Sequence, residues 1–157
     1  MKSAAWTDPE LWRSLRDGSA CPICLRGSPR DVIAEFPVTW VSAGSDAPLP
    51  GYACVVSKRH VVEPYELPAA EQAAFWDEVT TAAATLVDLF QPLKMNYEIH
   101  GNVIPHLHVH LYPRYAGDPY TTGALRPRNA SFTRSQDDLD RIGEAMLASA
   151  ARLARSS

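Results

Sequence analysis

The sequence predicts an α+β domain with an antiparallel sheet. Short segments rich in β-branched and aromatic residues lie on both sides of one long helical pattern at residues 69–90, and no βα unit repeats along the chain. The chain has 157 residues, 46% of them hydrophobic, which is enough apolar material for one ordinary core. We therefore expect a single domain over residues 1–157, with an N-terminal helix and loop at 8–30, a core at 31–115 and a C-terminal extension and helix at 116–155.

The N-terminal segment is expected to contain one short helix and one loop. Asp8 is suited to cap the helix, Pro9 fits its first turn, and Gly18 is suited to end it. Residues 18–30 contain several prolines and glycines that break all periodicity. We expect this stretch to be a loop.

Four segments carry the residue types of β-strands. Residues 31–43 predict two strands, or one strand bent at Pro37. Residues 44–51 contain prolines and glycines and are expected to form a turn. The remaining strands are expected at 52–57, 95–100 and 106–112.

Two helices are expected in the second half of the chain. Apolar residues recur at helical spacing over residues 69–90, and Pro68 suits the first turn of that helix. Ser135 and Asp138 resemble a capping box before a C-terminal amphipathic helix.

The composition excludes some classes of partner. A net charge of −3 and a pI near 5.9 argue against nucleic acid or an anionic membrane as a bulk partner. No run reaches membrane-spanning length, and residues 1–20 lack the apolar region of a signal peptide, so a cytoplasmic protein is expected. In that compartment the CxxC formed by Cys21 and Cys24 indicates metal or redox chemistry rather than a structural disulfide.

Three of the five histidines alternate with apolar residues at the end of the chain's central region. His106, His108 and His110 are separated by Leu107 and Val109. In a strand the apolar side chains would enter the core while the imidazoles line the other face, roughly 6.5 to 7 Å apart at the backbone. A neutral imidazole is a nucleophile near pH 7 and also the commonest metal ligand. The pattern therefore predicts either a phosphoryl-transfer site or a zinc site.

The CxxC has three interpretations. A thioredoxin-like redox motif requires a preceding strand and a helix that begins at the motif, and neither is expected here. A zinc ribbon requires a second close pair of ligands, whereas Cys54 stands alone in an apolar strand and is most simply a buried small hydrophobe. The interpretation that remains is a structural zinc whose other ligands come from distant parts of the chain.

Several segments together resemble the histidine triad (HIT) superfamily. Residues 102–114 resemble its His-φ-His-φ-His signature, where φ is apolar, and residues 50–61 resemble its Pro-Gly-His to Lys-x-His segment. Residues 114–118 resemble its C-terminal flank, so the likeness covers about residues 20 to 120. Two departures are Tyr52, where the family usually has histidine, and a turn shortened by one residue before Pro50.

The resemblance implies a homodimer of half-barrel subunits that binds a small nucleotide over the histidine face. It also implies that His108 attacks the α-phosphorus and forms a phosphohistidine, while His110 and Asn102 bind the phosphoryl or leaving-group oxygens. A further set of residues would contact the rest of the nucleotide, although the apolar members are equally typical of a core strand: Asn96, Asp46, Val32, Ile33 and Phe36.

Some members of this superfamily join a CxxC to two histidines around a structural zinc. By resemblance, the ligands here are Cys21, Cys24, His60 and His106, with His100 as a rival to His60. Four such ligands would form a closed tetrahedral site with no catalytic water. His108 would then be free to attack.

Two other functions remain open at the level of sequence. A catalytic zinc hydrolase would use His106, His108 and His110 as metal ligands. A non-catalytic nucleotide-binding module would share the fold and the site without turnover. Within the enzyme interpretation, the residues do not distinguish hydrolysis from transfer or select the leaving group.

Overall fold

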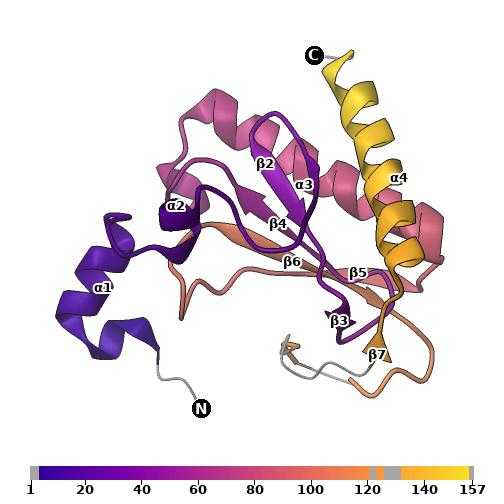
Figure 1. The fold of residues 1–157 in the computed structure, drawn as a ribbon, viewed down its shortest axis with the longest axis horizontal. Coiled ribbons are helices and arrows are strands. Elements are labelled where there is room, and N and C mark those ends of the chain that lie inside the picture. Colours follow the sequence, from indigo (N-terminus) through magenta and orange to yellow (C-terminus); the bar gives the residue numbers. More distant parts are fainter. Residues whose placement is uncertain (1–3, 121–122, 126–131, 156–157) are drawn as a thin grey trace.

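A computed structural model describes residues 4–120, 123–125 and 132–155. Five strands form one open antiparallel sheet in the order β1-β2-β4-β6-β5, and β3 pairs with β7 in a small second sheet (Figure 1). The predicted α+β class with an antiparallel sheet is therefore confirmed. The strands are β1 (Val32–Glu35), β2 (Thr39–Ser42), β3 (Asp46–Ala47), β4 (Ala53–Ser57), β5 (Lys94–Glu98), β6 (His108–Arg114) and β7 (Phe132–Thr133). The helices are α1 (Pro9–Arg16), α2 (Pro22–Arg26), α3 (Ala69–Phe90) and α4 (Gln136–Ala154), with 3-10 turns at Ala5–Thr7 and Pro64–Glu66.

The segment at 31–43 forms two strands, as the first of the two interpretations predicted. The chain turns at Pro37, where Phe36 N–H donates to the Thr39 carbonyl over 2.9 Å. The carboxylate of Glu78 on α3 accepts hydrogen bonds from Val38 N–H and from the Thr39 hydroxyl, the latter over 2.7 Å. A helix side chain thus satisfies the polar groups of a buried turn.

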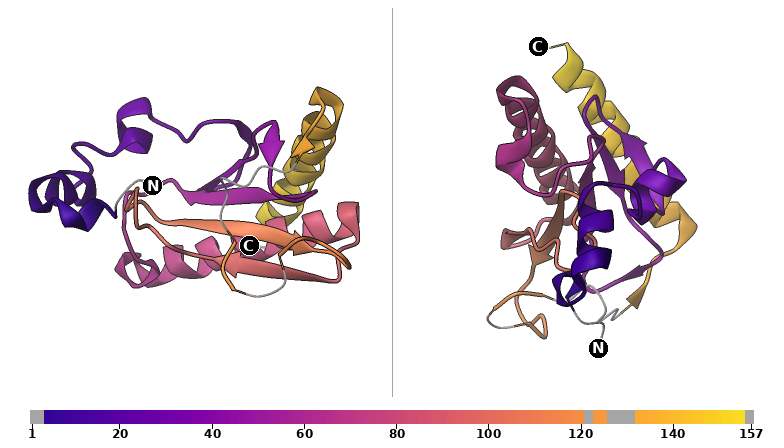
Figure 2. Two further views of the ribbon diagram at one scale, coloured as in Figure 1. Left: turned by 90° about the horizontal axis from the view of Figure 1, so that it is seen from below. Right: turned by 90° about the vertical axis from the view of Figure 1, so that its left-hand side faces the viewer.

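The core lies on one face of the sheet. Helix α3 packs across this face, and α4 packs against α3 and against β1 (Figure 2). Leu107, Val109 and Leu111 are fully buried in the main apolar cluster, as their alternation with the histidines predicted. Gly143 allows α4 to approach β1 closely, because an added Cβ would lie 3.0 Å from the Ile33 carbonyl oxygen.

The helix ends follow the predicted capping residues. Asp8 accepts hydrogen bonds from the N–H groups of Glu10 and Leu11 at the start of α1. Ser135 and Asp138 form the predicted capping box of α4. These two ends are set by local hydrogen bonding, which is why the sequence alone predicts them.

Several expectations about local structure were wrong, among them the turn at 44–51, in which Asp46–Ala47 form β3 and pair with β7. The stretch 18–30 is not entirely a loop, because residues 22–26 form the short helix α2, with Leu25 N–H donating to the Cys21 carbonyl. A helix therefore does begin at the CxxC, contrary to the expectation, with Cys21 as its N-cap. Strand β6 begins at His108 rather than at His106. The preceding residue, Leu107, exchanges backbone hydrogen bonds with Val61 and Ser57 instead of continuing the ladder with β5.

Within the described part of the chain, no helix is both long enough and apolar enough to cross a membrane.

Candidate active site and metal cluster

His108 and His110 lie on the face of β6 that points away from the core. Their cross-strand neighbours on β4 are Val56 and Cys54. On the other side, Glu98 of β5 is opposite His110. The two imidazole rings stand edge to face with centroids 4.9 Å apart. Adjacent strands therefore bring two imidazoles together on one face of the sheet.

The tautomer of His108 follows from its single backbone partner. Its Nδ1 lies 2.6 Å from the carbonyl oxygen of His106. A carbonyl oxygen only accepts, so Nδ1 carries the hydrogen and the Nε2 lone pair is available. Burial lowers the pKa of His108 below its ordinary value, although the His106 carbonyl opposes this. His108 thus presents a neutral ring with a nucleophilic Nε2.

His110 contacts a tyrosine on the neighbouring strand. The hydroxyl of Tyr52 lies 2.8 Å from His110 Nδ1, and the two rings are stacked. Tyr112 packs against both rings. Burial, with smaller effects from His108 and His100, lowers the pKa of His110 to about 3. His110 is therefore also neutral near pH 7.

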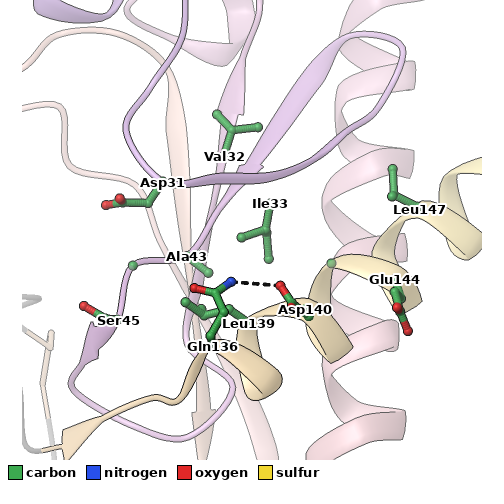
Figure 3. A pocket seen from close by; sticks show the side chains of 12 residues that line it. Asp31, Val32, Ile33, Ala43, Ser45, Gln136, Leu139, Asp140, Glu144 and Leu147 are labelled. Carbon is green, nitrogen blue, oxygen red and sulfur yellow. Dashed lines mark hydrogen bonds between the residues drawn. The ribbon is translucent and has the colours of Figure 1, made fainter.

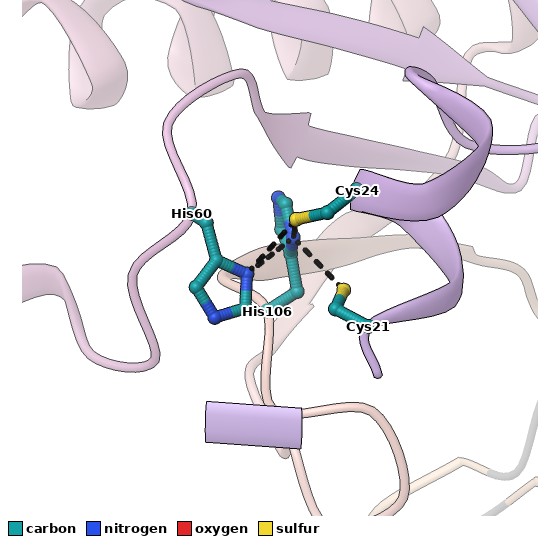
Figure 4. Close-up of side chains that lie close together, drawn as sticks. All are labelled: Cys21, Cys24, His60 and His106. Atoms are coloured by element: carbon teal, nitrogen blue, oxygen red, sulfur yellow. Dashed lines mark hydrogen bonds between the residues drawn. The ribbon is translucent and has the colours of Figure 1, made fainter. Parts of the chain in front are cut away.

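Four side chains from distant parts of the sequence form a compact cluster (Figure 4). The candidate ligand atoms of Cys21, Cys24, His60 and His106 all lie within 4.8 Å of one another. Cys24 Sγ is 3.2 Å from His60 Nδ1, and Cys21 Sγ is 3.5 Å from His106 Nδ1. The short helix α2 places both sulfurs on one side because residues three apart share a helix face. This set can hold a metal ion.

The two imidazoles of the cluster are oriented by backbone carbonyls. His60 Nε2 lies 2.9 Å from the Arg16 carbonyl oxygen, and His106 Nε2 lies 2.8 Å from that of Ser57. In both rings Nε2 therefore donates and Nδ1 presents its lone pair to the cluster. Such a carbonyl contact behind the ring is characteristic of metal-binding histidines.

The structure decides between His60 and His100 for this cluster. His100 Nε2 instead lies 3.0 Å from a carboxylate oxygen of Glu98. The sequence suggested that three imidazoles share one strand face, but His106 does not lie on that face. It precedes β6, and its side chain is fully buried beside the cysteines. Only His108 and His110 remain on the strand face.

The other sequence-predicted contacts are spread over different elements. Asn102 is exposed in the loop before β6, and its carbonyl accepts from Ala5 N–H. Asn96 lies on β5 opposite Tyr112, on the histidine face. Asp46 is exposed on β3, where it accepts from the Thr133 hydroxyl. Phe36 is 2% exposed and belongs to the main core, so its interpretation as a core residue is the one that the structure supports.

Val32 and Ile33 line a groove of about 590 Å³ between β1, the loop after β2 and the start of α4 (Figure 3). Acidic and polar side chains form part of its wall, including Asp31, Asp140 and Glu144. No triad histidine lines this groove. Val32 is therefore near a hollow of the surface, but this hollow is not the space over the imidazoles.

Sequence reasoning missed two residues of the histidine face. Cys54 was expected to be a buried small hydrophobe, whereas it is half-buried and stands opposite His110. Burial raises the pKa of the Cys54 thiol to about 12, so this thiol stays protonated. Tyr52 was noticed only as a departure from the family pattern. The register between β4 and β6 places Cys54 on this face, and no pattern within the sequence specifies that register.

The open antiparallel sheet with its covering helices matches the fold of solved histidine triad proteins. A HIT domain model matches residues 26–117, which is more than half of the chain. The chain therefore belongs to the HIT family.

Solved structures agree with this fold. A histidine triad protein from Bradyrhizobium japonicum is 26% identical, with a TM-score of 0.61 over 73% of this chain and 86% of that one. A hypothetical histidine triad nucleotide-binding protein from Sulfolobus tokodaii is 21% identical, with a TM-score of 0.60 over 86% and 93% of the two chains. A Zn-bound histidine triad family protein from Mycobacterium smegmatis is 21% identical, with a TM-score of 0.58 over 88% and 99%. A comparison with functionally curated proteins found no match.

Proposed function

We propose that this protein is a nucleotide phosphohydrolase or nucleotidyl transferase that cleaves a nucleoside-phosphate conjugate at its α-phosphate through a phosphohistidine on His108. The observation that carries the proposal is the pair of neutral imidazoles on β6. The His106 carbonyl holds His108 with Nε2 unprotonated, and His110 lies beside it at 4.9 Å between centroids. Family membership and the nucleotide-binding relative support a nucleotide as the ligand.

The proposed reaction has two steps. His108 Nε2 attacks the α-phosphorus, a P–N bond forms, and the bond from phosphorus to the leaving group (P–O, or P–N in a phosphoramidate) breaks with its electron pair on the leaving atom. The leaving atom takes up a proton. Water or another hydroxyl acceptor then attacks the phosphorus and releases its proton to solvent, and the P–N bond breaks with its electron pair on His108 Nε2, which restores the neutral imidazole.

The neighbouring polar groups would stabilise charge on the phosphoryl oxygens. His110 donates a hydrogen bond to these oxygens, and Asn102 contacts the bridging or leaving oxygen. Asn96, on the same face of the sheet, contacts the nucleotide. Asp46 and Val32 remain proposed contacts to the nucleoside, in line with the family resemblance.

The Cys21, Cys24, His60 and His106 cluster fits a structural zinc ion. A tetrahedral site with nitrogen and sulfur ligands separates the ligand atoms by about 3.3 to 3.8 Å. Four of the six separations run from 3.1 Å, between His60 Nδ1 and His106 Nδ1, to 3.7 Å, between Cys24 Sγ and His106 Nδ1, and all six are within 4.8 Å. The Zn-bound relative supports this choice of metal. Bound zinc would fasten the N-terminal segment to the residues before β6.

The same geometry argues against a catalytic zinc held by three histidines. Both ring nitrogens of His106 have partners elsewhere, Nδ1 among the cysteines and Nε2 at the Ser57 carbonyl. His106 is thus not free to join His108 and His110 around one ion.

A cytoplasmic homodimer is part of the proposal. Strand β5 is an edge of the five-stranded sheet, and Leu93, Tyr97 and Ile99 beside or within it are exposed. An apolar sheet edge is normally covered by another surface. A second copy of the chain would complete the sheet across a twofold axis.

The proposal is tested with a panel of adenosine and guanosine conjugates: dinucleoside polyphosphates, phosphoramidates, sulfates and nucleotide-linked sugars. We expect release of a nucleoside monophosphate from at least one class, and a rapid quench should trap a phosphohistidine that maps to residue 108. Tight nucleotide binding without turnover would instead favour the non-catalytic binding module. An adduct on another histidine would overturn the mechanism.

A further inference from the structure

The hydroxyl of Tyr52 contacts Nδ1 of His110, which is not the ring nitrogen proposed to contact the phosphoryl oxygens. The separation of Tyr52 Oη and His110 Nδ1 is 2.8 Å, well within hydrogen-bond range. The rings are stacked at 18° between planes, with centroids 6.0 Å apart. Tyr112 packs on Tyr52 at 5.0 Å between centroids. The phenol of Tyr52 is therefore positioned both by its hydrogen bond and by packing against the rings of His110 and Tyr112.

The backbone of Tyr52 is also held from outside the family-matched region. Arg134, which is 5% exposed, donates from Nη1 to the Tyr52 carbonyl over 2.8 Å and from Nε to the Gly44 carbonyl over 3.0 Å. Arg134 lies beyond residues 26–117. The C-terminal segment that contains β7 and α4 thus anchors the residue that contacts His110.

Donor and acceptor strengths decide the direction of the Tyr52 to His110 hydrogen bond, because a neutral imidazole nitrogen is a stronger acceptor than a phenol oxygen and a phenol hydroxyl is a stronger donor than an imidazole N–H. If His110 Nδ1 carried the hydrogen, it would donate to Tyr52 Oη, and the half-buried phenol would still need an acceptor for its own proton. A polar hydrogen without an acceptor in such a place is unfavourable. If Tyr52 donates instead, the phenol proton has an acceptor, and the hydrogen of His110 lies on Nε2, where a bound ligand can accept it. Burial, together with the nearby Cys54 and Tyr112, raises the pKa of Tyr52, so its hydroxyl keeps the proton that it donates.

We infer that Tyr52 is a positioning residue, which donates to His110 Nδ1 and thereby holds His110 as the tautomer with its hydrogen on Nε2. This inference rests on the proposed function for its catalytic consequence. The two histidines of β6 then have opposite tautomers. His108 offers a lone pair at Nε2 to the phosphorus, and His110 offers an N–H at Nε2 to the phosphoryl oxygens. The His106 carbonyl thus sets the tautomer of the nucleophile His108, and the Tyr52 phenol sets that of the hydrogen-bond donor His110.

The tautomer is read directly by ¹⁵N NMR of the imidazoles in the zinc-loaded full-length protein near pH 7, without substrate. We expect the wild type to show His110 with Nε2 protonated and Nδ1 unprotonated, and Tyr52→Phe to show a mixture of the two tautomers. Tyr112→Phe is the matched control, because the Tyr112 hydroxyl is buried with no hydrogen-bond partner among the described residues, and it should keep the wild-type pattern.

Kinetics supply the second measurement. With a cleaved nucleotide, Tyr52→Phe should lower kcat by about tenfold with little change in KM, which corresponds to the loss of one aligned hydrogen bond in the transition state. Tyr112→Phe should keep both values. Protonated Nδ1 on His110 in the wild type, or an unchanged tautomer in Tyr52→Phe, would overturn the inference. The wild-type spectrum needs neither a variant nor turnover, so it tests the inference even if Tyr52→Phe fails to fold. If no nucleotide is cleaved, that result counts against the proposed function and not against the tautomer of His110.

Discussion

The backbone carbonyl oxygen of His106 accepts a hydrogen bond from Nδ1 of His108 over 2.6 Å. The same residue directs its side chain into the cysteine cluster. One residue thus links the candidate metal site to the candidate nucleophile, through its side chain on one side and its backbone on the other. A substitution that disturbs the cysteine and histidine cluster should therefore also alter the position of the His108 ring.

Replacing the histidines one at a time should separate their roles. His108→Ala should lower kcat by roughly 10⁴-fold or more while nucleotide binding persists, because the nucleophile is deleted and the oxygen-binding groups remain. His110→Ala should cost less, on the order of 10² to 10³, as for other transition-state donors. His100→Ala is the matched control, since His100 is exposed and paired with Glu98. Steady-state kinetics and equilibrium binding measure these effects, and near-normal turnover in His108→Ala would refute the assignment.

Removing the metal should destabilise the fold before it affects the chemistry directly. We expect one zinc per chain by elemental analysis, and Cys24→Ser should lose both the metal and several kcal/mol of unfolding free energy, as for other structural zinc sites. His106→Ala should resemble Cys24→Ser. Cys54→Ala should retain the metal, because Cys54 lies outside the cluster on β4. A fully folded wild-type protein that contains no zinc would exclude the site.

The exposed edge of the sheet should mediate dimer formation. Light scattering of the wild type at micromolar concentration should give twice the mass of the chain. Tyr97→Lys on β5 should shift the protein toward monomer, because it places a charge on a half-exposed apolar side chain at the sheet edge. Leu147→Lys on α4, at a comparable exposure of 53%, should leave the mass unchanged. A wild type that is monomeric throughout this concentration range would contradict the proposal.

Glu78 should give the folded protein a distinct dependence on pH. Burial raises the pKa of Glu78 above its ordinary value of 4.5, although hydrogen bonds from Thr39 and Val38 oppose the shift. Between the two pKa values, Glu78 is protonated in the folded state and ionised in the unfolded state. The folded state therefore becomes less stable relative to the unfolded state as pH rises. The unfolding free energy should therefore fall between pH 4.5 and the raised folded pKa, by about 1.4 kcal/mol for each unit between the two.

Glu78→Gln removes this titration. Relative to the wild type, its unfolding free energy should increase with pH across that window, as measured by urea denaturation at a series of pH values. Glu144→Gln, at an exposed position of α4, should follow the wild-type curve. A Glu78→Gln protein whose stability falls relative to the wild type as pH rises would show that the ionised carboxylate is favoured in the folded state.

The local features of the fold could be predicted because they depend on neighbouring residues. Asp8 and Ser135 cap their helices by bonding to N–H groups two or three residues away. Helix α3 spans Ala69–Phe90, the range that its apolar periodicity predicted. The parity of a strand likewise fixes that Leu107, Val109 and Leu111 enter the core. Even where a boundary was wrong, as at the start of β6, the sidedness of His108 and His110 was not affected.

By itself, therefore, the sequence determined the fold class, the N-terminal caps of α1 and α4, the sidedness of β6 and the cysteine pair three residues apart. Tertiary structure decided which side chains meet. The contact between Cys21 and His106 joins residues 85 apart, and that between Tyr52 and His110 joins residues 58 apart. Whether His60 or His100 joins the cluster depends on where the loop after β4 lies relative to α2, and Cys54 faces His110 because of the register between β4 and β6. Periodicity carries no information on such pairings, because they are set by how separate elements pack together.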